Sequence, residues 1–288
     1  MASTDEAREL PLGAQHLAGC LALSASANWN QNAADWQLML ELGRGYGLML
    51  GDGTLTASTL TLTYGSGFAW VSMVLVLPQY RRHGYATHLL RRALEELAAA
   101  RRAAVLDATP AGRAVYAQEG FHDTWGFRRL ALPGAWRIDT AAISGIYVRS
   151  LQPSDWPRIA ALDAPAFGAD RARVLRALAL RLPEAALVAE RSGELTGFLL
   201  GRDGRAARQL GPLVARDPGS ARALLAAASS RVAPPLYIDV VDREKALGTW
   251  LEQRGFAFQR PFTRMVRGAE RAPGEASLVY CPAGAELG

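Results

Sequence analysis

Lysine and cysteine are almost missing from this sequence of 288 residues. Lys245 is the only lysine, so arginine supplies nearly all of the positive charge. Cys20 and Cys281 lie far apart and in no spacing typical of a metal or redox site, so we expect no metal cofactor and a reducing compartment, the cytoplasm. No apolar run approaches the roughly 20 residues that cross a bilayer. The polar N-terminus, Met1–Leu10, lacks the basic start of a secretory signal.

The composition is that of a globular protein, with 50% hydrophobic and 20% charged residues. The chain is nearly twice as long as a typical domain of roughly 150 residues, which favours two domains. The net charge is +5, but the arginines are scattered among acidic residues rather than gathered in a tail or stripe. We therefore attribute the charge to compositional bias and expect neither a nucleic acid nor a membrane as a partner.

A weak internal repeat supports the two-domain organisation. Leu50–Thr56 has the pattern of a hairpin turn between apolar stretches, and Arg191–Thr196 repeats it. Further along, Gln118–Phe121 is echoed by Gln253–Phe256. At the same spacing, these are followed by Phe127 and Arg129 in the first copy and by Phe262 and Arg264 in the second. The hairpin pattern and the glycine–phenylalanine segment thus recur in the same order, which predicts a duplicated fold.

The pattern of helices and strands predicts an α/β fold in each copy, a mixed and mostly antiparallel sheet flanked by helices. We expect domains at residues 1–135 and 145–268, a linker near Leu132–Thr140, and a tail at 269–288 with a strand at Leu278–Cys281. The glycine-rich segment Gly43–Gly47 is predicted to be a flexible turn before a strand. Predicted helices include Leu17–Ser26, Ala33–Leu42, Tyr85–Ala99, Ala111–Gln118, Ala169–Leu182 and Ser220–Ser230, and predicted strands include Leu55–Thr63, Phe68–Val76 and Leu236–Val241.

The segment Val74–Thr87 carries the most informative motif. An apolar strand runs into a basic turn, and the turn leads directly into a helix. Free N–H groups at a helix N-terminus bind anions, and successive amides in a tight turn do the same. Gly84 lets the backbone approach a ligand closely and Ala86 leaves space beside it, while Arg81 and Arg82 add positive charge. The segment therefore predicts a pyrophosphate site.

This motif resembles a known family signature. Arg81-x-x-Gly84-x-Ala86 is similar to the Q/R-x-x-G-x-G/A pattern of the GNAT acetyltransferase superfamily. The context agrees with it: Asp107–Pro110, then a helix bearing Tyr116, then Gly120-Phe121. The resemblance covers about residues 6–130 and, more faintly, the second copy, so the whole chain resembles a tandem GNAT protein.

The resemblance implies acetyl-CoA as cosubstrate and assigns roles to the matching positions. The amides of Val74 and Val76 would pair with the pantetheine arm, an amide freed by a bulge near Met73 or Val74 would hold the thioester oxygen, and Tyr116 would protonate the departing thiolate. Tyr116 has a structural alternative, which is packing on its helix. The implied cofactor site comprises Val74, Leu75, Val76, Arg81, Arg82, His83, Gly84, Tyr85, Ala86, Thr87 and Thr109.

The general base and the acceptor pocket stay open at this point. Candidate bases near the expected site are Asp35, Glu41, His122 and Asp123, although each of these residue types is more often solvated or structural; His83 is expected to face solvent. Three tryptophans, Trp29, Trp36 and Trp125, are candidates for lining an aromatic pocket, although packing explains most of them and leaves Trp36 open.

The second copy fits the same pattern at Arg216–Ala221, but its chemistry does not suit phosphate. Pro218 has no N–H to donate, and Asp217 places a negative charge where phosphate would bind. Aligning the glycine–phenylalanine pairs puts Leu251 opposite Tyr116. We therefore predict a degenerate second domain, which either only packs or walls the acceptor pocket of the first.

The expected function is acetyl transfer from acetyl-CoA to a primary amine, preferably of a small molecule, in a ternary complex formed by a monomer or homodimer. Two alternatives stay open, namely acetylation of protein lysines or N-termini, and a CoA-binding sensor without turnover. An alkaline optimum is expected if the acceptor must lose its own proton.

Overall fold

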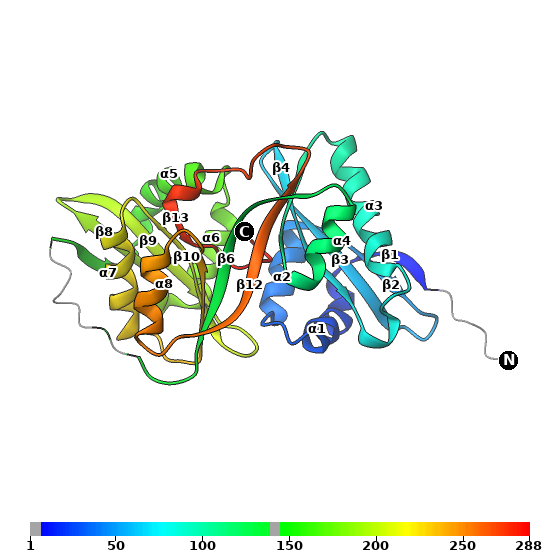
Figure 1. The fold of residues 1–288 in the computed structure, drawn as a ribbon, viewed down its shortest axis with the longest axis horizontal. Helices are drawn as coiled ribbons and strands as arrows, with labels where there is room; N and C mark the ends of the chain where they lie inside the picture. Colours follow the sequence, from blue (N-terminus) through cyan, green and yellow to red (C-terminus); the bar gives the residue numbers. More distant parts are fainter. Residues whose placement is uncertain (1–6, 137, 139–144) are drawn as a thin grey trace.

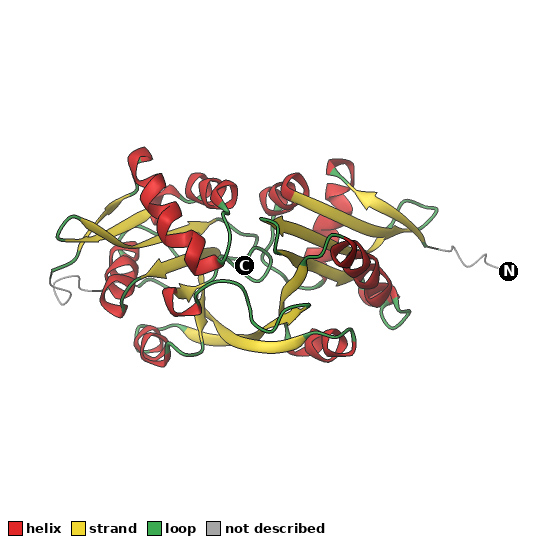
Figure 2. Ribbon diagram, turned by 90° about the horizontal axis from the view of Figure 1, so that it is seen from above, coloured by secondary structure: helices red, strands yellow, loops and turns green. Residues whose placement is uncertain are grey.

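A single sheet runs through both halves of the molecule, and helices cover it on both faces (Figures 1 and 2). The structure is a computed structural model that describes residues 7–136, 138 and 145–288. The predicted linker at Leu132–Thr140 therefore lies partly outside the described residues, as do residues 1–6 at the N-terminus. The strand order is β1-β2-β3-β4-β5-β12-β6-β11-β10-β9-β8-β7, with β13 paired to β10.

The first half contains four helices and six strands among its described residues. In chain order these are β1 (Arg8–Leu12), α1 (Leu17–Ser26), α2 (Ala33–Leu42), β2 (Gly43–Met49), β3 (Leu55–Tyr64), β4 (Phe68–Val76), α3 (Tyr85–Ala99), β5 (Ala103–Ala108), α4 (Pro110–Gln118) and β6 (His122–Leu132).

The local sequence explains these elements and their faces. Asn32 caps α2, accepting from the N–H of Asp35, whose carboxylate accepts from the Asn32 N–H in return. The apolar stripe of α3 is buried on one face of the sheet, while α1 and α2 pack on the other with the fully buried Trp36. The bounds predicted for α1, α2, β4 and α3 are those observed.

One prediction in this half was wrong. Gly43–Gly47 is not a turn but part of β2, which pairs with β1 and β3. The glycines serve close packing, because a Cβ on Gly45 or Gly47 would come within 2.8 or 2.7 Å of the Leu12 side chain. The sequence analysis also missed β1, whose five residues carry little periodic signal.

The second half repeats the order of the first. Its elements are β7 (Tyr147–Ser150), α5 (Trp156–Phe167), α6 (Ala172–Arg181), β8 (Leu187–Arg191), β9 (Glu194–Arg202), β10 (Arg208–Ala215), α7 (Pro218–Ser229), β11 (Leu236–Val241), α8 (Lys245–Glu252), β12 (Ala257–Arg267) and β13 (Val279–Cys281). β10 was not among the predicted elements, and β13 lies within the tail segment where a strand was expected.

The two halves exchange their last long strands. β12, which closes the second half in sequence, pairs with β5 of the first half, and β6 of the first half pairs with β11 of the second. β6 and β12 also pair with each other and run side by side through the centre of the molecule (Figure 1). The two sheets expected from the sequence are thereby joined into one.

The repeated Phe and Arg positions lie at the centre of this exchange. Phe127 faces Phe262 across the β6–β12 pair, with ring centroids 4.9 Å apart and nearly parallel planes. Arg129 forms two hydrogen bonds, 2.7 and 2.8 Å long, to Asp239 on β11. Arg264 forms two of 2.9 Å to Asp107 on β5. Each half thus sends an arginine to a buried aspartate of the other.

Within the described residues, no helix is both long enough and apolar enough to pass through a membrane.

Candidate functional site

The first half opens between β4 and β5. The two strands pair in parallel only from Phe68 to Trp70. Beyond that point β4 continues to Val76 along β3, while β5 continues along β12. On the β5 side, the edge of β4 from Val71 to Val76 therefore has no strand beside it among the residues that the structure describes. An extended ligand can add to such an edge through main-chain hydrogen bonds.

A β-bulge lies where the opening begins. Ser58 pairs with Leu75 and Leu60 pairs with Ser72, so two residues of β4 face one residue of β3. Met73 takes up a left-handed conformation with φ of 51°, and its carbonyl accepts a 2.7 Å hydrogen bond from the Ser58 hydroxyl. The bulge stands at Met73–Val74, where the family resemblance placed the amide for the thioester oxygen.

The direction of the β4 amides fits a ligand in the opening. The Leu77 N–H donates to the Thr56 carbonyl on β3 at 2.9 Å, and Ser58 pairs with Leu75. Backbone groups alternate between the two sides of a strand. The N–H group of Val76 consequently faces away from β3, into the opening, whereas Val74 lies in the bulge, where the alternation is interrupted.

The loop after β4 supplies an anion site at its far end. His88 makes the first bond within α3, to the Gly84 carbonyl, so the N–H groups of Tyr85, Ala86 and Thr87 point out of the helix start. Gly84 has φ of 79° and open space where a side chain would project. Arg81, Arg82 and His83 are exposed beside it, and the Arg81 Nε–H donates to the Val76 carbonyl at 3.2 Å. Free N–H donors and positive charge, the features that bind anions in proteins, are thus gathered at this end.

A cavity lies at the other end of the opening and draws its walls from both halves. Its free volume of about 510 Å³ includes space open to solvent. The bulge and Leu106–Asp107 of β5 form one wall. Arg260 and Phe262 of the exchanged strand β12, together with Ala285 and Glu286 near the C-terminus, also line the cavity. The second half therefore contributes part of the lining of this cavity.

Tyr116 projects from α4 into this cavity, and Thr109 lines it at the start of the same helix. Thr109 also caps α4, with its hydroxyl 3.4 Å from the Gly112 N–H. The Tyr116 ring lies over Gly112, where an added Cβ would come within 2.8 Å of the ring edge. Burial raises the pKa of Tyr116 to about 12, so the hydroxyl stays protonated at neutral and mildly alkaline pH.

The structure places the four suggested bases away from the cavity lining. Asp35 is fully buried and paired with Arg181 and Arg202. Asp123 pairs with Arg113 on the surface, and the exposed His122 ring lies 3.2 Å from the Glu270 carbonyl. Glu41 is exposed on α2.

Of the three tryptophans, Trp29 lines the cavity. Trp36 is fully buried in the core and donates to the Ser24 hydroxyl at 2.9 Å, so it packs rather than lines a site. The guanidinium of Arg264 lies 4.1 Å from the ring centroid of Trp125, which gives Trp125 a structural contact.

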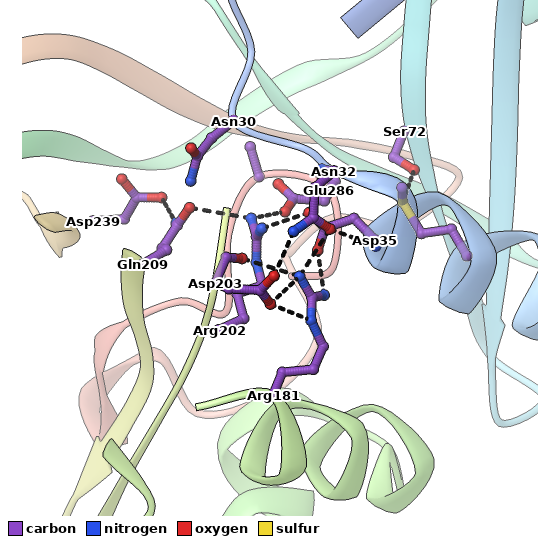
Figure 3. A network of polar contacts seen from close by, with 12 residues as sticks. Asn30, Asn32, Asp35, Ser72, Arg181, Arg202, Asp203, Gln209, Asp239 and Glu286 are labelled. Atoms are coloured by element: carbon purple, nitrogen blue, oxygen red, sulfur yellow. Dashed lines mark hydrogen bonds and ion pairs between the residues drawn. The ribbon is translucent and has the colours of Figure 1, made fainter. Parts of the chain in front are cut away.

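A carboxylate that the sequence analysis missed borders the cavity. Glu286 is 3% exposed; its Oε1 accepts from Arg202, while its Oε2 has no partner among the described residues. Arg202, itself fully buried, also donates to Asp35 at 2.8 Å and to Gln209 at 3.1 Å. Figure 3 shows this network, in which groups from both halves and from the C-terminal segment fix the Glu286 side chain.

The corresponding place in the second half is filled by the chain itself. β10 and β11 pair from Arg208 to Leu210 and then part, as β4 and β5 do. β13 pairs with β10 beyond that point, at Leu213 and Val214. It thus occupies the side of β10 that corresponds to the open edge of β4.

The N-terminus of α7, which corresponds to that of α3 in the first half, is occupied by a side chain of the protein. Asp217 accepts from the Ser220 N–H at 3.0 Å and from Arg191 at 3.2 Å, so its carboxylate sits on the N-terminus of α7. Leu251, at the position matching Tyr116, is fully buried. The closed edge and the capped helix give a physical reason for a degenerate second site.

Comparisons with known proteins agree with this arrangement. A model of the acetyltransferase (GNAT) family matches residues 18–121, and a model of an acetyltransferase (GNAT) domain matches residues 159–281. A Bacillus subtilis (strain 168) protein, named as the uncharacterized N-acetyltransferase YitH, is 24% identical over 255 residues, 86% of this chain and 86% of that protein.

Solved structures show the same fold. A Pyrococcus horikoshii protein described as a candidate acetyltransferase aligns with a TM-score of 0.80 and 21% identity, covering 100% of this chain and 98% of its own. A tandem GNAT protein from the clavulanic acid biosynthesis pathway aligns with a TM-score of 0.60 and 17% identity, covering 94% of this chain and 100% of its own.

Proposed function

The chain belongs to the GNAT acetyltransferases, with one GNAT domain matched in each half, and we propose that its first half binds acetyl-CoA and transfers the acetyl group to a primary amine. The observation that carries the proposal is the opening between β4 and β5, which has a bulge at one end and an anion site at the other.

The site residues divide the work between binding and chemistry. The amides of Val74 and Val76 hold the pantetheine arm, and the amides at the start of α3 hold the pyrophosphate with Arg81 and Arg82. The bulge turns a backbone N–H near Met73 or Val74 toward the thioester oxygen, where charge develops during transfer. Leu75, which faces β3, keeps the strand edge in place.

Acetyl-CoA supplies the acetyl group as a thioester, so a bond forms between the amine nitrogen and the carbonyl carbon while the carbon–sulfur bond breaks. The Tyr116 hydroxyl gives its proton to the departing sulfur. The proton lost by the amine returns through solvent to Tyr116. The high pKa of Tyr116 suits this role, because the hydroxyl is protonated when the thiolate leaves.

A small molecule is the acceptor that we prefer. The cavity is walled by the second half and by the C-terminal residues Ala285 and Glu286, which restricts the space beside the bulge. Acetylation of protein lysines or N-termini is the alternative within enzymes. A sensor that binds CoA without turnover has no use for a protonated Tyr116 beside the opening, so we rank it lower.

Calorimetric titration of acetyl-CoA into the full chain tests the site. We expect one binding site per chain in the wild type, no binding in Gly84→Asp, and unchanged binding in Gly219→Asp, which alters the second half. Gly53→Asp is a matched control, because Gly53 also has a positive φ, 87°, with open space around it, but lies in the β2–β3 turn.

Equal loss of binding in the Gly53 and Gly84 variants would point to a general fold defect. Absence of binding to the wild type, or loss in the Gly219 variant alone, would refute the assignment of the site to the first half. If binding is as expected, release of CoA in the presence of a panel of amines distinguishes an enzyme from a sensor.

A further inference from the structure

We propose that the acceptor is a zwitterion, a primary amine that also carries a carboxylate, bound through Arg260 at one end and through Glu286 and Gln31 at the other. This inference rests on the proposed function and adds the substrate class. It follows from three polar side chains that line the same cavity and lack the partners that groups in such places normally have.

Arg260 is a half-buried cation without a counterion. No carboxylate of the described residues lies within 4.0 Å of its guanidinium. Its cross-strand neighbour on β6 is Arg129, another cation, and Arg129 already takes both oxygens of Asp239. Burial and the charge of Arg129 lower the pKa of Arg260. A guanidinium in this position is stabilised by an incoming carboxylate, which it can bind with two parallel hydrogen bonds.

Two residues that line the same cavity each have a buried acceptor atom. Glu286 Oε2 and Gln31 Oε1 have no hydrogen-bond partner among the described residues, although both side chains are more than nine-tenths buried. An unpaired buried acceptor destabilises a fold. The three hydrogens of an ammonium group can satisfy both atoms at once, and the negative charge of Glu286 favours a cation over a neutral donor.

The network around these atoms leaves them available to a ligand. Glu286 Oε1 is held by Arg202, and Asp107 in the cavity wall is held by Arg264. The remaining charged groups of the cavity are thus paired inside the protein. One unpaired cation, Arg260, and one carboxylate oxygen without a partner, Glu286 Oε2, are left, which suit the two ends of an amino acid.

The test compares matched acceptors. CoA release from acetyl-CoA is followed with a thiol reagent in the full chain, using α-, β- and γ-amino acids, each beside its own primary amide. We expect kcat/KM for at least one acid to exceed that of its amide by about tenfold or more, mainly through KM; tenfold corresponds to about 1.4 kcal/mol of binding.

Three variants locate the effect. Arg260→Met should raise KM for the acid and leave the amide nearly unchanged, so the preference disappears. Arg260→Lys should keep part of the preference because it keeps the charge. Arg267→Met is the matched control, since it removes an arginine of the same strand outside the cavity lining and should keep the whole preference.

The outcomes separate the two proposals. Amides as good as acids throughout the panel, a preference that persists in Arg260→Met, or no turnover of any acid by a chain that binds acetyl-CoA would each overturn the zwitterion proposal alone. Failure of the wild type to bind acetyl-CoA would overturn the proposed function as well. Should Arg260→Met fail to fold, the wild-type comparison and Arg260→Lys still decide.

Discussion

At the scale of single residues, Tyr116 combines a structural and a chemical position. Its ring packs over Gly112 and against Phe121, with ring centroids 6.0 Å apart. Its hydroxyl is not needed for that packing, because no hydrogen bond from it to a described residue holds the ring. Replacing Tyr116 by phenylalanine removes only the hydroxyl, and so separates its packing from its role in proton transfer.

We predict that Tyr116→Phe lowers kcat by about 10²–10⁴-fold, the usual worth of a general acid, while the affinity for acetyl-CoA stays within about twofold. Steady-state kinetics and calorimetry on the same preparations check both values. Unchanged kcat would show that Tyr116 only packs, the alternative that its helix position also allows.

The pH profile of the wild type adds a second check on the same residue. Because burial raises the pKa of Tyr116 to about 12, its protonated form prevails below that value and its ionisation causes no loss of activity up to about pH 10. Activity should rise between about pH 6 and pH 9 as the acceptor amine loses its proton. A flat rate over this interval, or a fall near pH 9 that Tyr116→Phe abolishes, would contradict this account.

At the scale of elements, the two halves differ at the place where their central strands part. The β4 edge is free beside the bulge, whereas β13 pairs with β10 at the equivalent place. The α3 start is open at Gly84, whereas the α7 start is capped by Asp217. The second half therefore has two independent obstacles to binding CoA.

We predict that Asp217→Ala lowers the free energy of unfolding by about 1 kcal/mol, as loss of a helix N-cap does, and creates no second acetyl-CoA site, because β13 still covers the β10 edge. Denaturant unfolding and the stoichiometry of calorimetric titration measure the two effects. Asp217→Asn, which keeps an acceptor for the cap, should be close to the wild type. A stoichiometry of two would mean that the charge of Asp217 alone blocked the site.

At the scale of the whole molecule, strand exchange makes the halves depend on each other. β5 of the first half pairs with β12 of the second, and β11 of the second half pairs with β6 of the first, so each strand loses a partner if the other half is absent. The pairs Arg264–Asp107 and Arg129–Asp239 are buried at the junction. The cavity depends on the same junction, since β12 brings Arg260 and Phe262 to it. Assembly of the site and folding of both halves are thus one event.

We predict that Arg264→Met lowers the free energy of unfolding by about 3–5 kcal/mol, because it leaves Asp107 charged and unpaired in the interior. Arg91→Met is the matched control. It also removes an arginine with two hydrogen bonds to a carboxylate, that of Glu119, but on the surface, where such a pair contributes at most about 1 kcal/mol. Equal effects in denaturant unfolding would show that the junction does not depend on the buried pair.

Much of the local structure was predictable from the sequence. The bounds predicted for α1, α2, α3 and β4 are those observed, with apolar periodicity as the signal for α3, and Arg81–Ala86 carries the family motif within consecutive residues. The repeat was visible because Gly120-Phe121 and Gly255-Phe256 keep their spacing to the phenylalanines and arginines that follow. The roles of the cosubstrate residues and the domain boundaries stay predictions.

The cavity beside the bulge was not predictable, for a physical reason. Arg260, Glu286 and Gln31 stand in unremarkable sequence, and they meet only because β12 crosses into the first half and the C-terminal segment returns to the junction. Hydrophobic periodicity and turn residues act over a few neighbours, so the sequence by itself determined the elements, the duplication and the anion loop. Which β-edge each strand joined was decided by contacts between distant residues, the Phe127–Phe262 stack and the two buried arginine–aspartate pairs, and these exist only in the tertiary structure.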